Sequence, residues 1–213
     1  MRESFPDSGL PVFGFACFRR RDNLTYQTIA MPVLVCFLRG VNVGGHAKIK
    51  MDALRSLFVT LKFEEPQTYV QSGNIVFKTS ERNLGLVAAR IKQAITKKFA
   101  CSPEIMLRTV AELRAVVSNN PFAKRANIEP GKLHAFFLAA QPAKNAEENL
   151  RQLAIRPEEL HLVGRELFIY FPNGVGKSKL PWARLDKALQ TPGTGRNWNS
   201  VTKVLELAER LGS

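Results

Sequence analysis

Apolar and polar positions follow two different periods along the first half of this chain, and the periods predict where strands and helices lie. Residues 33–38 are continuously apolar, which is typical of a buried strand. Residues 51–61 have apolar side chains at helical spacing, and so do residues 84–99. Between these helices, the segment TYVQSGNIVFKT (68–79) has two β-rich arms around Ser-Gly-Asn, which predicts a tight hairpin. A further strand is predicted over residues 104–109.

The second half of the chain repeats this order of elements. A strand is predicted over residues 132–139 and a helix over 146–153. The segment ELHLVGRELFIYF (159–171) then predicts another tight hairpin, and LPWARLDKAL (180–189) a second helix. A final strand is clear only in the first half. The last helix has an apolar stripe that we expect to pack against the body of the protein.

The two hairpins support an internal duplication. Setting Gly164 on Gly73 also places Phe168 on Phe77. The pattern therefore predicts an α+β fold of two ferredoxin-like βαββαβ-type units, formed by internal duplication, with an additional C-terminal helix. The alternative is an accidental similarity between two short hairpins.

The expected boundaries divide the chain into four parts. Strong periodicity begins after Met31, so residues 1–30 are interpreted as a poorly ordered N-terminal extension, or translation starts at Met31. Residues 31–110 form the first α/β unit, and residues 111–131 form a connecting helix and loop. Residues 132–213 form the second α/β unit with the C-terminal helix.

Charge narrows the choice of partners. The 213 residues include 31 Lys and Arg against 18 Asp and Glu, a formal charge of +13. This balance favours an anionic small molecule or nucleic acid as partner, and the alternative is that the basic residues only solvate helix faces. For nucleic acid, an open sheet would need aromatic side chains facing solvent. Tyr69 and Phe77 are expected on one face of the first hairpin, which is as easily the core side.

Cysteine, histidine and hydropathy patterns exclude several other classes. Three cysteines and three histidines are scattered along the chain, with neither a disulfide framework nor the spacing of a metal site. No apolar run approaches the ~20 residues that a membrane-spanning helix needs, and a signal peptide is not indicated. We therefore expect a cytoplasmic protein without a structural metal or a cofactor, and no membrane association.

The segment FLRGVNVGG (37–45) resembles a phosphate-binding loop because it joins a predicted strand to a predicted helix. It matches neither the dinucleotide fingerprint G-x-G-x-x-G nor the Walker pattern G-x-x-x-x-G-K-[ST]. The later GKS (176–178) also fails the Walker pattern, because Phe171 stands five positions before Gly176. The segment 37–45 is therefore an anion-facing loop by hypothesis, with backbone conformation as the simpler reason for its glycines.

Five sequence blocks together resemble a known family. FLRGVNVGG, the KM before the first helix, TYVQSGNIVF, GVGKSKL and RNWNSV are similar to the successive signature blocks of the bacterial DUF1697 family, a domain of unknown function. The resemblance covers nearly all of residues 31–213 and implies the duplicated α/β fold and a start at Met31. It implies no reaction. Ser200 departs from the usual Thr, and residues 1–30 have no counterpart.

The polar residues of these blocks are candidate ligand-binding residues. Their side chains are cationic or form hydrogen bonds, and none has an obvious core role by periodicity. They are Arg39, Asn42, Gln71, Ser72, Asn74, Lys177, Ser178, Lys179, Arg196, Asn197 and Asn199. If the fold gathers them, they form a cationic, amide-rich pocket for a phosphate or a carboxylate, with arginine as a bidentate clamp. Trp198 is the candidate for stacking on a base, although burial is its expected alternative.

Each of these residues also has a structural interpretation. The polar residues of the first hairpin satisfy a tight turn. Asn197 and Asn199 cap the last helix, and Arg39 pairs with an internal carboxylate.

Three functions follow as hypotheses. The first is an intracellular module that binds an anionic ligand, either a nucleotide or nucleic acid. The second is a small enzyme acting on a phosphorylated metabolite, with Arg39 or Arg196 as clamp and Lys177 as acid or base. No nucleophile, carboxylate pair or helical histidine pair supports catalysis. The third is a structural or protein-interaction module whose signature loops only stabilise the joint between the two units.

Overall fold

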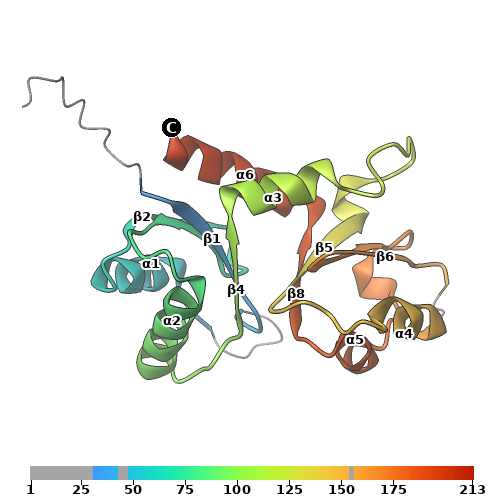
Figure 1. The fold of residues 1–213 in the computed structure, drawn as a ribbon, viewed down its shortest axis with the longest axis horizontal. Helices are drawn as coiled ribbons and strands as arrows, with labels where there is room; N and C mark the ends of the chain where they lie inside the picture. Colours follow the sequence, from blue (N-terminus) through green and yellow to red (C-terminus); the bar gives the residue numbers. More distant parts are fainter. Residues whose placement is uncertain (1–30, 43–47, 154–155) are drawn as a thin grey trace, which may run out of the picture.

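The computed structural model describes residues 31–42, 48–153 and 156–213, so the expected N-terminal extension, residues 1–30, lies outside the described residues. The described part is a mixed α/β structure with two four-stranded antiparallel sheets and six α-helices (Figure 1). The first sheet contains β1 (Val33–Leu38), β2 (Glu64–Tyr69), β3 (Asn74–Lys78) and β4 (Ile105–Thr109). The second sheet contains β5 (Leu133–Leu138), β6 (Glu159–Val163), β7 (Glu166–Tyr170) and β8 (Gly193–Asn197).

The helices fall in the predicted segments. They are α1 (Met51–Thr60), α2 (Leu84–Phe99), α3 (Val110–Ser118), α4 (Ala146–Leu153), α5 (Trp182–Leu189) and α6 (Trp198–Gly212), with 3-10 turns η1 (Pro130–Lys132) and η2 (Val175–Lys177). The strands are ordered β2-β3-β1-β4 in the first sheet and β6-β7-β5-β8 in the second. The first strand of each half is therefore central in its sheet, which explains why these strands are continuously or largely apolar.

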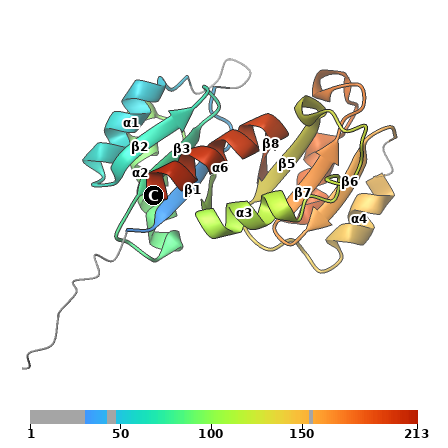
Figure 2. The same ribbon diagram turned by 90° about the horizontal axis from the view of Figure 1, so that it is seen from above.

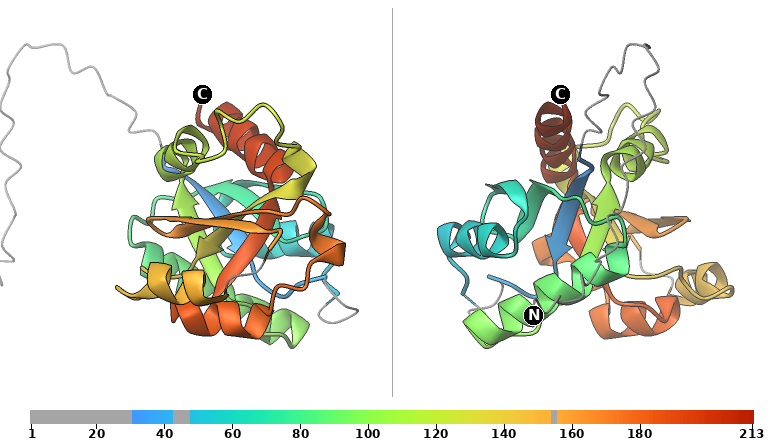
Figure 3. Two further views of the ribbon diagram at one scale, coloured as in Figure 1. Left: turned by 90° about the vertical axis from the view of Figure 1, so that its right-hand side faces the viewer. Right: turned by 60° about the vertical axis from the view of Figure 1, so that its left-hand side comes forward.

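Three hydrophobic clusters hold the layers together. One lies between the first sheet and helices α1 and α2, and another lies between the second sheet and helices α4 and α5. The third, the central cluster, joins the facing sides of both sheets to α3 and α6 (Figures 1 and 2). Helices α3 and α6 lie side by side across both sheets (Figures 1 and 3). The expected packing of the last helix is confirmed, because its apolar stripe is buried in the central cluster.

Strand β8 was not expected, and its sequence explains why. It reads Gly-Thr-Gly-Arg-Asn, which lacks the apolar alternation that predicts a strand. The strand lies at a sheet edge, and within the sheet it pairs with β5. Gly195 is needed there because a Cβ at this position would stand 2.7 Å from ring carbons of Phe136. Arg196, expected in a loop before the last helix, therefore lies in a strand.

The strand register corrects the predicted alignment of the two hairpins by one residue. In the first sheet Val35 pairs with Val76, and in the second sheet Ala135 pairs with Phe168. Because Val35 and Ala135 both point into the central cluster, Phe168 corresponds to Val76. Phe77 lies in the cluster under α1 and α2, so placing Phe168 on Phe77 was wrong.

The expectation that Tyr69 and Phe77 share a face was also wrong. Tyr69 pairs with Asn74 and packs against the central cluster, whereas Phe77 points to the opposite side of the sheet. Counting eight residues along the chain fails because the tight turn between the arms resets the alternation. Gly73 in this turn has a φ of +70°, and a Cβ there would stand 2.6 Å from Val41 Cγ2.

Candidate functional site

The predicted site residues do not meet in one pocket. They fall into four places: a buried joint between the sheets, an ion pair beside it, a hollow at the start of α1, and the two segments that precede α5 and begin α6. The exposure of the predicted residues differs between these places. Exposure determines which of the residues a ligand can reach.

Arg196 lies in the buried joint and uses every donor on protein acceptors. Arg196 is only 7% exposed, although its side chain is a cation. Each guanidinium group has five N–H bonds, and each is directed at an acceptor within hydrogen-bonding distance. The acceptors are Asn74 Oδ1, the carbonyl oxygens of Leu38, Ser72 and Gly195 at 2.8 Å each, and Thr194 Oγ1 at 2.7 Å. Two of the predicted residues, Ser72 and Asn74, therefore serve the same cation from the first hairpin.

The arginine remains charged in this environment. Burial lowers the pKa of Arg196 to about 10, which still leaves the guanidinium protonated at neutral pH. Its carbon lies 5.5 Å from the centroid of the Phe37 ring, a cation–π contact. Because no N–H is left over, we assign Arg196 to the joint between the sheets and not to the clamping of a ligand.

Arg108 is a second buried cation, which the sequence reasoning missed. Arg108 lies on β4 opposite Val35, and Arg196 occupies the equivalent position on β8, opposite Ala135. Arg108 is 1% exposed. Its Nε donates to Glu166 Oε1 at 2.8 Å. Further bonds go to the carbonyl oxygens of Leu107 at 2.8 Å, Leu138 at 3.0 Å and Arg165 at 3.3 Å. Each arginine thus reaches from the last strand of one sheet into the hairpin of the other.

Two stacked phenylalanines lie between the two cations. The rings of Phe37 and Phe137 stack with centroids 4.1 Å apart and planes 15° apart. Arg196 lies against Phe37, and the Arg108 guanidinium carbon lies 5.6 Å from the Phe137 centroid. A sequence signal for Arg108 existed, since it is the one charged residue inside the apolar strand 105–109. A charge in a buried strand must find partners, so it indicates a contact with another element.

Arg39 forms an ion pair with a carboxylate, as its structural interpretation predicted. Its guanidinium donates to both carboxylate oxygens of Asp186 on α5, one of them at 3.2 Å. The two side chains remain 35% and 41% exposed. The pair links the loop after β1 to the second half of the chain, but solvent screens it.

We expect replacement of Arg39 by alanine to have a small effect on stability. An ion pair this exposed contributes up to about 1 kcal/mol to the free energy of unfolding. The measurement is urea unfolding followed by circular dichroism, with Asp186→Ala as the matched variant. A loss of more than about 3 kcal/mol in either variant would contradict this assignment.

The third place is a hollow of about 630 Å³ at the start of α1. We call it the α1 hollow, and its lining residues are Asn42, Lys48, Ile49, Lys50, Met51, Asp52 and Gln71. Asn42, with a φ of +56°, lines the hollow on one side. Its side chain donates to the carbonyl oxygens of Ile49 at 3.0 Å and Gln71 at 2.8 Å, and its Oδ1 accepts from the Ile49 N–H at 2.8 Å.

The α1 hollow is electrostatically suited to an anion. Ile49 is buried, so the flanking Lys48 and Lys50 point outward, and both are exposed. Lys50 is the N-cap residue of α1 and makes no side-chain cap, so that among the described residues no side chain occupies the first N–H groups at the positive end of the helix dipole. Asp52 is the one acid on the wall, and its carboxylate is paired with Arg55.

The remaining predicted residues lie in the second half. Lys177 and Lys179 are exposed in the segment before α5, and Ser178 Oγ accepts a hydrogen bond from the Leu180 N–H at 3.1 Å. Asn197 caps α6 by accepting from the Ser200 N–H, at 2.9 Å.

The other two residues at the start of α6 differ in exposure. Trp198 packs against the central cluster and lies 6.1 Å from the Phe168 ring, whereas Asn199 is exposed. The core therefore covers part of the Trp198 ring, which favours the expected burial over stacking on a base.

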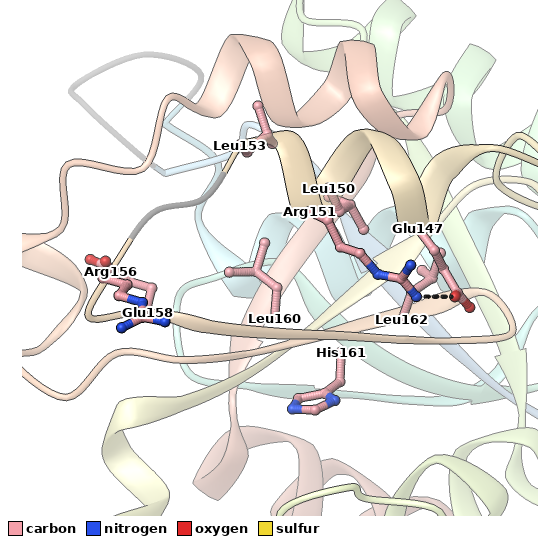
Figure 4. Close-up of a pocket in the computed structure, with 9 residues that line it drawn as sticks. All are labelled: Glu147, Leu150, Arg151, Leu153, Arg156, Glu158, Leu160, His161 and Leu162. Atoms are coloured by element: carbon pink, nitrogen blue, oxygen red, sulfur yellow. Dashed lines mark ion pairs between the residues drawn. The ribbon is translucent and has the colours of Figure 1, made fainter.

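A further cavity, of about 710 Å³, lies between α4 and the edge strand β6 (Figure 4). Leucines of both elements form its floor, and Arg151 and Arg156 stand at its rim. His161 lies on the other side of β6, where its ring meets Phe122 edge-on at 5.0 Å. Arg151 is paired with Glu147 at 3.6 Å, so its charge is partly compensated. None of the predicted residues lines this cavity.

Metal and membrane expectations can be compared with the described residues. Within residues 31–42, 48–153 and 156–213, no group of three His, Cys, Asp or Glu side chains is placed to hold a metal ion. In the same ranges, the helices are too short or too polar to cross a bilayer.

Comparisons with known proteins identify relatives in sequence and fold. A family model described as "Protein of unknown function (DUF1697)" matches residues 31–168. The match ends before the GVGKSKL and RNWNSV blocks. The chain is also similar to the solved structure of the conserved bacterial protein SP0830 from Streptococcus pneumoniae, with a TM-score of 0.63 and 21% identity over 84% of this chain and 99% of that chain. At that identity the likeness concerns the fold alone. A comparison with curated proteins gives no match.

Proposed function

Because this chain belongs to the DUF1697 family of proteins of unknown function, its role must come from its own geometry, and we propose that it binds an anionic ligand in the α1 hollow. The observation that carries the proposal is a helix start that no side chain of the described residues caps, next to two exposed lysines, Lys48 and Lys50, on the wall of a 630 Å³ hollow. Backbone N–H groups and the helix dipole favour a phosphate at such a position. The net charge of +13 favours the same class of ligand.

The two alternative functions find different support. An enzyme using Lys177 would need a partner group, and the described residues place no carboxylate or histidine in hydrogen-bonding contact with its amine. A structural role is supported for one subset of residues, because Arg196, Ser72 and Asn74 form a saturated joint. We therefore propose that the signature residues divide: some hold the halves together, and Asn42 and Gln71 shape the ligand site.

The finer description of the fold is part of this proposal. We infer two ferredoxin-like units that arose by duplication, residues 31–110 and 132–213, connected by residues 111–131. The equal strand orders of the two sheets and the equivalent positions of Arg108 and Arg196 support this inference. We also propose a cytoplasmic setting, which the free thiol of the buried Cys36 supports.

Replacement of both hollow lysines tests the ligand site. ATP and inorganic pyrophosphate are the probes in a thermal-shift measurement at low salt. A probe at 100 times its Kd stabilises the wild type by about 2.7 kcal/mol, which corresponds to about 5–10 °C in Tm for a chain of this length. We expect Lys48→Ala/Lys50→Ala to lose most of that shift while keeping its own Tm, because both side chains are exposed.

The matched control is Lys124→Ala/Lys144→Ala, which removes the same charge from two exposed positions outside residues 31–110, neither of which lines the hollow. It should retain the shift. If both double variants lose the ligand-induced shift in Tm equally, the shift depends on net charge and not on the hollow. If no phosphorylated probe shifts the Tm of the wild type, the ligand site is rejected.

A further inference from the structure

Trp182 is exposed where a large aromatic side chain is normally buried. It is the first residue of α5 and is 43% exposed. Among the large hydrophobic side chains that stand exposed in the described residues, it is the one aromatic. It belongs to none of the three hydrophobic clusters. Tryptophan is enriched at interfaces, so a half-exposed indole is a candidate contact surface when other rings hold it in place.

The ring of Trp182 rests on a fixed aromatic base. It stacks on Phe136 with centroids 5.6 Å apart and planes 29° apart, and it lies 6.1 Å from Phe171. Phe136 is held in turn against β8, where Gly195 leaves room for its ring. One side of the indole is therefore fixed by protein while the exposed part faces solvent, which is the arrangement of a stacking platform.

Two cations lie close to this platform in the sequence. Lys177 and Lys179 stand five and three residues before Trp182, in the segment that leads into α5, and both are exposed. Neither forms a salt bridge within the described residues. The one acid between residues 174 and 189 is Asp186, and Arg39 already occupies it. The surface is therefore positive around an apolar aromatic centre.

We propose that this surface, made of Trp182, Phe136, Lys177 and Lys179, binds single-stranded nucleic acid. A base stacks on Trp182, and the two lysines contact the neighbouring phosphates. A single strand fits because its bases are open for stacking, whereas those of a duplex are covered. An acidic peptide would use the charges but offers the ring no base to stack on.

The site is separate from the α1 hollow, and a different observation carries it. Binding of a phosphate in the hollow does not require an aromatic ring. Stacking of a base on Trp182 does not require the N–H groups at the start of α1. Variants of Lys48 and Lys50 should therefore leave binding at Trp182 in place, so that failure of one proposal does not decide the other.

Tryptophan fluorescence provides a direct test, because the chain has two tryptophans, Trp182 and Trp198. In the Trp198→Phe variant of the full chain, an oligo-dT strand of about 12 nucleotides should quench the remaining emission. In the Trp182→Phe variant, the emission of Trp198 should stay constant. Circular dichroism establishes that each variant is folded.

Affinity measured by anisotropy of a labelled strand completes the test. Loss of the ring in Trp182→Leu should weaken Kd by about 5- to 140-fold, and Trp182→Phe should recover part of the affinity. Lys177→Ala/Lys179→Ala should lower the slope of log K against log salt by about 1.4. Lys97→Ala/Lys98→Ala should leave Kd unchanged.

Four results would overturn the proposal. The first is an absence of oligonucleotide binding at low salt. The second is equal affinity for Trp182→Leu and the wild type, and the third is equal affinity for a duplex of the same length. Binding to anionic vesicles without binding to oligo-dT would also overturn it, in favour of a membrane surface.

Discussion

Replacing Arg196 by methionine should destabilise the protein more than any surface substitution, by about 3 kcal/mol or more. Methionine fills much of the space but leaves the oxygens of Leu38, Ser72 and Asn74 without their donor. Each buried acceptor left unsatisfied costs about 1–3 kcal/mol. For a chain of this length, 3 kcal/mol lowers Tm by about 6–12 °C. Urea unfolding and thermal melting followed by circular dichroism measure the loss.

Two further variants isolate the cause. Arg196→Lys should lose nearly as much stability, because an ammonium group cannot serve five acceptors arranged around a planar fork. Arg210→Met, an exposed position on α6, should stay within about 0.5 kcal/mol of the wild type. If Arg196→Met were as stable as the wild type but failed to bind ATP, Arg196 would be a ligand clamp and our assignment would be wrong.

The second large effect is expected at Arg108. Arg108→Met leaves the carboxylate of Glu166 without its cation, and the Glu166 side chain is only 13% exposed. Breaking one side of a buried ion pair costs about 3–5 kcal/mol. Burial already lowers the pKa of Arg108, and the Glu166 carboxylate opposes that shift, so the cation depends on its partner. Urea unfolding measures the change in the free energy of unfolding.

A double-mutant cycle shows whether the cost arises from the unpaired charge. Replacing both members of a buried pair by apolar residues is often neutral or stabilising. Arg108→Met/Glu166→Leu should therefore recover the part of the lost stability that arises from the unpaired carboxylate, but not the part that arises from the carbonyl oxygens of Leu138 and Arg165. If the double variant is as unstable as the single one, the hydrogen bonds to Leu138 and Arg165 carry the energy instead of the charge pair.

The two arginines differ in a way that these experiments separate. Arg108 has a carboxylate partner, whereas Arg196 is held by neutral oxygens alone. A carboxylate partner permits an apolar replacement of the whole pair. Arg196 has no charged partner to remove with it, and its backbone carbonyl acceptors, like those of Arg108, stay whatever residue is substituted. We therefore expect that no second substitution repairs Arg196→Met.

Local sequence patterns determined most of the secondary structure. Apolar runs and helical spacing depend on residues close in sequence, so the strand 33–38, both hairpins and the helices were predicted. The family resemblance rested on contiguous blocks in the same way, and the match over residues 31–168 confirms it. The register failed by one residue in the second hairpin because turn geometry, not periodicity, sets which face follows a turn.

Only the tertiary structure decided what the polar residues do. Arg196 and Asn74 are 122 residues apart in sequence, and Arg39 and Asp186 are 147 apart, so no local pattern could pair them. Exposure is also a property of the fold: both tryptophans stand at the start of a helix, yet Trp198 packs against the central cluster and Trp182 faces solvent. The sequence determined which residues carry charge and rings. Their availability for a ligand depends on which sheet, helix or hairpin from the other half of the chain covers them.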